Sequence, residues 1–155
     1  YLIYNNYRIK CAVGKRGIGI KKKEGDFITP KGLFKIKYIL YRKDQVKNLK
    51  AKKKKIVIKK EMGWCDDPSS SKYNKLIQYP FKYSSEKLFR KDNIYDIIFV
   101  LDYNMSPIIK KKGSAIFIHV AKKNYAHTKG CVAIKKLELL KLAEILKKNT
   151  KVKII

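Results

Sequence analysis

A histidine and a cysteine in the last third of the chain have the residue types that nucleophilic catalysis needs. His119 lies in the apolar run Ile116–Val120, and Cys131 follows Gly130 where a second apolar run begins. A cysteine nucleophile needs a nearby base to become a thiolate, and its substrate's oxyanion needs oriented N–H groups. If both runs are neighbouring strands, His119 and Cys131 meet at their ends, where Gly130 permits a tight turn.

Both residues also have a structural interpretation. A cysteine in a strand is usually a small buried apolar residue, and a lone histidine is usually a hydrogen-bonded structural residue. Cys65, beside Trp64 and the pair Asp66 and Asp67, is a second candidate thiol. Two adjacent carboxylates disfavour a thiolate, so we interpret Cys65 as structural or substrate-lining.

Short β-branched and aromatic runs predict the strands that would position these residues. We expect strands at Tyr7–Val13, Ile18–Lys22, Leu33–Leu40, Lys55–Lys59, Tyr95–Tyr103, Ser114–Val120, Cys131–Ile134 and Lys151–Ile155. One amphipathic helix is predicted over Lys136–Lys148, with an apolar stripe of Leu139, Leu140, Ala143 and Leu146.

The segment Gly63–Ser85 has little periodicity and is predicted to be a long ordered loop or lid. Ser84–Arg90 is predicted to form one helical turn with a capping serine. No linker or internal repeat divides the chain, so residues 1–155 are expected to form one domain. The pattern predicts a mostly-β fold, a sandwich or barrel, with one C-terminal helix packed on it.

The charge balance has two interpretations. The chain has 39 Lys and Arg against 12 Asp and Glu, a net charge of +27, yet only four of the basic residues are Arg. A polyanionic partner such as nucleic acid or a wall polymer would explain this excess. A coding bias towards Lys, Ile, Tyr and Asn on a solvated surface also explains it, and this interpretation is favoured because nucleic-acid readers usually rely on Arg. No apolar stretch has the length of a membrane span.

Two separated motifs are similar to those of the L,D-transpeptidase (YkuD-type) catalytic domain. The first is Thr29-Pro30-Lys31-Gly32-Leu33-Phe34, and the second is His119 followed by Thr128-Lys129-Gly130-Cys131-Val132. The intervening Gly63–Pro68 and Gly113–His119 segments resemble one branch of the same family. The resemblance extends from about Gly14 to the C-terminus.

The resemblance implies a cysteine acyltransferase that acts on peptidoglycan stem peptides without a metal or cofactor. Cys131 would be the nucleophile, His119 the base oriented by the Val120 carbonyl, and the N–H groups around Gly130 and Cys131 the oxyanion site. Substrate contacts are expected from Thr128, Ser114, Trp64 and Asp67. Asp67 belongs to a carboxylate pair that would receive an amine of the stem or simply order its loop.

Some positions depart from the family pattern. Lys129 stands where most members have His, and Ala133 stands where many have a carboxylate-binding Arg or Asn. His127 is a second candidate base. An L,D-carboxypeptidase, a wall-binding module without activity and a Lys-rich nucleic-acid-binding module therefore remain as alternatives. We expect a monomer in the cell envelope, made with a signal segment that precedes Tyr1.

Overall fold

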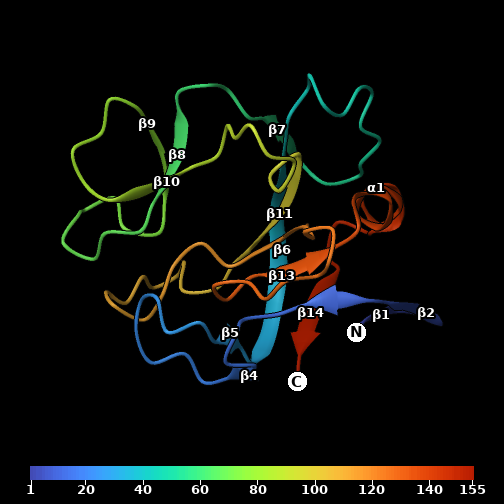
Figure 1. Cartoon of the computed structure of the whole chain (residues 1–155), viewed down its shortest axis with the longest axis horizontal. Coiled ribbons are helices and arrows are strands. Elements are labelled where there is room, and N and C mark those ends of the chain that lie inside the picture. The colour runs from blue at the N-terminus through green and yellow to red at the C-terminus, as the bar shows by residue number, and fades with distance from the viewer.

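A long bent strand, β6 (Gly32–Tyr41), is the centre of the fold, which a computed structural model describes for residues 1–155. Its second half pairs antiparallel with β11 (Ile97–Leu101). On its other edge, the first half of β6 pairs antiparallel with β14 (Lys151–Ile154), and the second half pairs parallel with β7 (Lys55–Val57). A register shift between Val100 and Leu101 accompanies the bend. The sheet curls into a half-barrel (Figure 1).

The same sheet continues through β12 (Phe117–Val120), β13 (Val132–Ile134) and β3 (Cys11–Ala12), in the order β14-β6-β11-β12-β13-β3. Here β12 and β13 run parallel, whereas the pairs β11–β12 and β13–β3 are antiparallel. Every residue of β11, β12 and β13 is buried. Strands covered on both faces explain why their sequences read as continuous apolar runs rather than alternating ones.

The helix α1 (Lys136–Ile145) covers one face of this sheet. Leu139, Leu142, Ala143 and Leu146 from the helix segment join the larger of two hydrophobic clusters, together with Ile118 and Val120 of β12. Of the predicted helical stripe, Leu140 is only partly buried. The helix ends at Ile145, earlier than predicted, because Leu146 takes an extended conformation.

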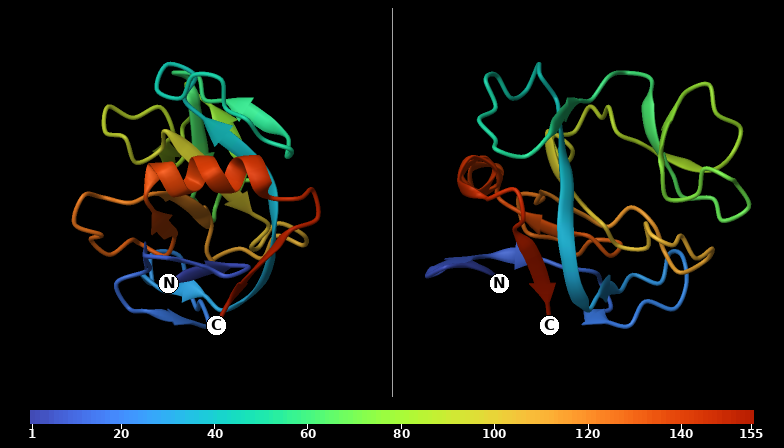
Figure 2. Two further views of the ribbon diagram at one scale, coloured as in Figure 1. Left: turned by 90° about the vertical axis from the view of Figure 1, so that its right-hand side faces the viewer. Right: turned by 180° about the vertical axis from the view of Figure 1, so that it is seen from behind.

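A small antiparallel sheet covers the opposite face. It contains β10 (Ser85–Lys87), β8 (Met62–Cys65) and β9 (Leu76–Gln78), in that order. Figures 1 and 2 place it on the other side of β6 from α1. Trp64 packs edge-on against Phe117 of β12, with ring centroids 5.1 Å apart, at the centre of the second hydrophobic cluster.

Two predictions for this region are wrong. Ser84–Arg90 is not a helical turn, because Ser85–Lys87 pairs with Gly63–Cys65 as β10. The predicted loop Gly63–Ser85 contains most of β8 and all of β9. Strands of three or four residues show too little alternation to be recognised from sequence.

The remaining strands are short. The pair β1 (Leu2–Tyr4) and β2 (Tyr7–Ile9) forms a hairpin, and β4 (Ile18–Gly19) pairs parallel with β5 (Thr29–Pro30). The predicted strand Tyr7–Val13 is thus divided into β2 and β3, and Ile18–Lys22 is reduced to two residues. The predicted mostly-β fold with one C-terminal helix is confirmed.

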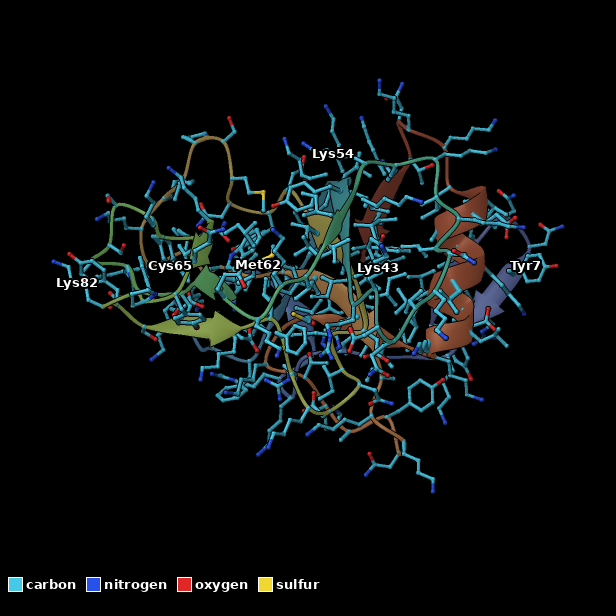
Figure 3. All side chains as sticks on the ribbon, turned by 90° about the horizontal axis from the view of Figure 1, so that it is seen from above. Tyr7, Lys43, Lys54, Met62, Cys65 and Lys82 are labelled. Atoms are coloured by element: carbon cyan, nitrogen blue, oxygen red, sulfur yellow. The ribbon has the colours of Figure 1, made fainter.

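The basic side chains are distributed over most of the molecule. Seen from above, nitrogen-tipped side chains extend outward around the outline, both near the small sheet at Cys65 and Met62 and near the helix (Figure 3). Two lysines, Lys21 and Lys53, are buried instead. The helix-forming segment has neither the length nor the apolar character to cross a membrane.

Candidate active site

Cys131 lies at a tight turn that leads into β13. Gly130 has φ of +141°, a conformation that favours glycine. The Thr128 hydroxyl holds this turn, since it donates to the Cys131 carbonyl at 2.6 Å and accepts from the Gly130 N–H at 3.1 Å. Because the Gly130 N–H is used in this way, the unpaired Cys131 N–H is the donor that remains for an oxyanion.

The two motifs noted in the sequence meet at this turn, although 102 residues separate Thr29 from Cys131. The Thr29 hydroxyl donates to the Cys131 carbonyl at 3.4 Å and accepts from the Gly14 N–H at 2.8 Å. The carbonyl oxygen of Ile28 lies 2.9 Å from where a Cβ on Gly130 would stand. The Thr-Pro motif therefore forms the wall behind the cysteine turn.

Replacing Gly130 by alanine is expected to destabilise the fold and slow any reaction at Cys131. The new Cβ would meet the Ile28 carbonyl and would add the cost of a positive φ, about 1–3 kcal/mol. Gly17→Ala is the matched control, because Gly17 has φ of +80° but nothing within 4 Å of its Cβ position. Urea unfolding checks this, and equal losses in both variants would refute the steric part of the argument.

His119 is held in one orientation by the backbone. Its Nδ1 lies 3.0 Å from the Val120 carbonyl oxygen. A carbonyl can only accept, so Nδ1 carries the proton and Nε2 keeps the lone pair that a general base needs. The Tyr95 ring packs edge-on against the imidazole, with centroids 5.5 Å apart.

The parallel register of β12 and β13 brings His119 and Cys131 to one face of the sheet. His119 is opposite Ala133, two residues beyond Cys131 along β13. Alternate residues of a strand share a face, so both side chains point away from α1, towards the small sheet. Both line one cavity of about 230 Å³.

The thiol and the imidazole are both neutral at rest. Burial raises the pKa of Cys131 to about 12, and the nearby Glu86 charge adds to this effect. Burial lowers the pKa of His119 to about 4, although the hydrogen bond with Val120 opposes the change. The thiol donates to the Ala115 carbonyl oxygen at 3.1 Å. Proton transfer to His119 therefore requires the thiol to leave Ala115.

The lowered pKa of His119 predicts acid-sensitive stability. An unfolded histidine binds a proton below pH 6.5, whereas His119 in the folded protein resists protonation down to about pH 4. As the pH falls from 6.5 to about 4, the free energy of unfolding is therefore expected to decrease by about 3 kcal/mol. Urea titrations should show this slope reduced in His119→Asn and retained in His127→Asn, whose side chain is exposed. An unchanged slope in His119→Asn would contradict the assignment.

A hydrogen-bonded network supports the backbone around Ala115. The Asn74 amide oxygen accepts from the Ala115 N–H and from the Trp64 indole N–H, both at 3.0 Å. Its amide nitrogen donates to the carbonyls of Tyr103 and Asn104. Ala115 has φ of +53°, a conformation that this network holds in place.

Only one of the four predicted substrate-binding residues, Thr128, lines the cavity. Trp64 is buried in the second cluster, with its indole N–H bonded to Asn74. Asp67 accepts from the Ser69 N–H and hydroxyl and from the Ser84 N–H, so it orders its loop. Ser114 is buried and its hydroxyl has no partner. The substrate contacts of these three residues stay predictions.

The second cysteine and the second histidine lie differently from the first pair. Cys65 is fully buried in β8, and its thiol is 3.9 Å from the Asp67 carbonyl oxygen. His127 is exposed at the edge of the cavity. All three cysteines, including Cys11, are free thiols.

A buried ion pair lies behind the cysteine turn. The Lys21 ammonium contacts the Asp26 carboxylate at 2.5 Å and lies 3.5 Å from where a Cβ on Gly130 would stand. Burial would raise the pKa of Asp26, but hydrogen bonds from Lys21 and from backbone N–H groups lower it to about 2. The ammonium lowers the pKa of Cys131, though less than burial raises it.

Most residues that line the cavity were not among the predicted site residues. Glu86, Arg90 and Tyr95 all line the cavity beside Cys131. Glu86 and Arg90 lie in the segment predicted as a helical turn, so the sequence did not indicate that they would reach the cavity. Tyr95 was predicted to begin a buried strand, but it lies in the turn that precedes β11, where it is buried. Nothing in the sequence pairs its hydroxyl with the Glu86 carboxylate.

Comparison with known families identifies the family to which the chain belongs. The L,D-transpeptidase catalytic domain family, YkuD, matches residues 3–154 of the chain. The protein belongs to this family, so the resemblance seen in its two motifs is confirmed. No curated protein matches the chain.

Proposed function

We propose that the protein is a peptidoglycan-modifying cysteine L,D-transpeptidase that works through an acyl-enzyme. The observation that carries this proposal is the arrangement of His119 and Cys131 in one cavity, with the imidazole Nδ1 held by the Val120 carbonyl. A base whose free nitrogen is fixed, beside a thiol at a turn with an unpaired N–H, meets the geometric needs of thiol acylation. The family membership supplies the substrate class.

Acylation begins when the Cys131 thiol gives its proton to His119 Nε2. The sulfur attacks the carbonyl that joins the third residue of a stem peptide to the D-residue in fourth position. The Cys131 N–H donates to the oxyanion, and the turn fixed by Thr128 and Thr29 keeps that N–H in place. The His119 proton goes to the leaving amine, a D-amino acid departs, and a thioester at Cys131 remains.

Deacylation decides between two activities of the same site. An amine from a second stem peptide gives a cross-link, whereas water gives a shortened stem, which is L,D-carboxypeptidation. Because peptidoglycan lies outside the cytoplasm, this activity places the protein in the cell envelope. The net charge of +27 would attract it to an anionic wall.

Incubation with a defined disaccharide-tetrapeptide tests the proposal. Mass spectrometry should show loss of D-alanine with a dimer mass if the transpeptidase proposal is correct. Loss of D-alanine without a dimer would identify a carboxypeptidase. No change in the substrate, together with no acyl adduct on Cys131, would favour a binding module without activity and refute both enzymatic proposals.

A further inference from the structure

Glu86 is the one acidic residue in the wall of the cavity that holds Cys131. The wall also holds three basic side chains and two imidazoles: Arg90, Lys122, Lys129, His119 and His127. Arg90 is engaged by Asp92 through two hydrogen bonds of 2.8 and 2.7 Å. In a chain with more than three basic residues for each acidic one, a carboxylate in this position needs an explanation.

The fold fixes Glu86 firmly beside the nucleophile. Glu86 pairs with Trp64 in the small sheet, and Trp64 packs on Phe117. Phe117 in turn contacts Cys131, because its N–H donates to the Cys131 sulfur at 3.4 Å. Glu86 is near enough that its charge raises the pKa of the thiol. A carboxylate that opposes thiolate formation does not serve acylation.

Only one of the two oxygens of the Glu86 carboxylate has a hydrogen-bond partner in the protein. The Tyr95 hydroxyl donates to Oε1 at 2.7 Å. No Lys, Arg or His nitrogen lies within 4.0 Å of either oxygen, so Oε2 has no ion pair. Burial raises the pKa of Glu86, and the hydrogen bond from Tyr95 only partly opposes this. Glu86 is half-buried in the cavity wall, and Oε2 is its oxygen without a protein partner, so Oε2 is available to a cationic ligand in the cavity.

The proposed reaction brings one cation to this place. The amine that resolves the thioester arrives as an ammonium group and must lose a proton before its nitrogen can attack. We propose that Glu86 binds the ammonium group of the acceptor stem peptide through Oε2 and takes one of its protons. This proposal rests on the proposed function, and it assigns Glu86 to deacylation rather than to acylation.

Transfer of the acyl group from the thioester to the ammonium-bearing acceptor releases one proton. The ammonium gives a proton to the Glu86 carboxylate, and the neutral amine attacks the thioester carbon. The carbon–sulfur bond breaks, the new carbon–nitrogen bond remains, and the second amine proton passes through His119 to the Cys131 sulfur. Glu86 then releases its proton to water, so that thiol, amide and one proton are formed from thioester and ammonium.

Glu86→Gln tests the proposal through the fate of the thioester. In the assay, the wild-type protein and the variant are each acylated with the disaccharide-tetrapeptide and then offered a diamino acid amide as acceptor. We expect Glu86→Gln to form the thioester at the wild-type rate or faster, and to lower the ratio of cross-linked to hydrolysed product at least about tenfold. Glu144→Gln is the matched control, since Glu144 is an exposed helix residue.

Hydroxylamine supplies a second readout because it is already neutral at neutral pH. We expect the Glu86→Gln defect to be large with the ammonium acceptor and small with hydroxylamine. Equal defects with both acceptors would contradict the proposal and indicate a structural role. Glu86→Asp keeps the charge on a shorter side chain and should recover part of the preference for amine over water. A ratio of cross-linked to hydrolysed product no higher than that of Glu86→Gln would contradict the proposal.

The outcomes separate this proposal from the proposed function. If the wild-type protein forms no thioester, the proposed function is wrong. If the thioester forms but the partition between amine and water is the same in Glu86→Gln, or if wild type transfers only to water, the assignment of Glu86 is wrong while the acyl-enzyme mechanism stands.

Discussion

Cys131→Ala is expected to abolish release of D-alanine from a stem tetrapeptide, a loss on the order of 10⁶-fold, as for removal of a serine nucleophile from a protease. No other thiol can replace it, since Cys65 is fully buried within β8 and Cys11 does not line the cavity. Mass spectrometry of the intact protein should show an acyl adduct on wild type and none on the variant.

The fold should survive this substitution. The thiol makes two hydrogen bonds, as donor to the Ala115 carbonyl and as acceptor from the Phe117 N–H. Cys11→Ala is the control, because Cys11 is half-buried at the far side of β13 and should retain activity. Full activity of Cys131→Ala with an unchanged circular dichroism spectrum would show that the nucleophile lies elsewhere.

His119→Ala is expected to lower the rate of acylation at least ~10²-fold, the usual contribution of a positioned general base. The thiol pKa of about 12 makes this dependence strong, because very little thiolate forms without a base. Measuring the single-turnover rate of D-alanine release separates this step from deacylation. His119→Asn should lose a similar factor, although its amide can still donate to Val120.

His127→Ala is the informative comparison for this prediction. His127 is exposed at the cavity edge, so its removal should change acylation little. If His119→Ala keeps its rate and His127→Ala loses it, the roles of the two histidines are reversed. Loss in both variants to the same degree would indicate that they act together.

Local sequence patterns predicted the elements that carry His119 and Cys131. Ser114–Val120 and Cys131–Ile134 were predicted as strands, and β12 and β13 lie within them. The predicted helix and closing strand correspond to α1 and β14. Each of these elements contributes buried apolar side chains to the larger hydrophobic cluster, so tertiary contacts reinforce the local preference.

The surroundings of the pair could not be predicted in the same way. The contact between Thr29 and Cys131 joins segments that share no periodicity, so only the folded chain reveals it. The register that puts Glu86 opposite Trp64 depends on three short strands whose pairing is decided by packing on Phe117. Local propensity favoured a helical turn there, and the tertiary contacts overrode it.

The parallel pairing of β12 and β13 has an evolutionary consequence. Parallel neighbours cannot be joined by a tight hairpin, so the chain must travel back along the sheet through residues 121–131 before it enters β13. That return path supplies much of the cavity wall, namely Lys122, Ala126, His127, Thr128, Lys129 and Cys131. Mutation and insertion in this single connection can therefore change the shape and charge of the cavity while the buried strands, and the His119 that they carry, stay unaltered.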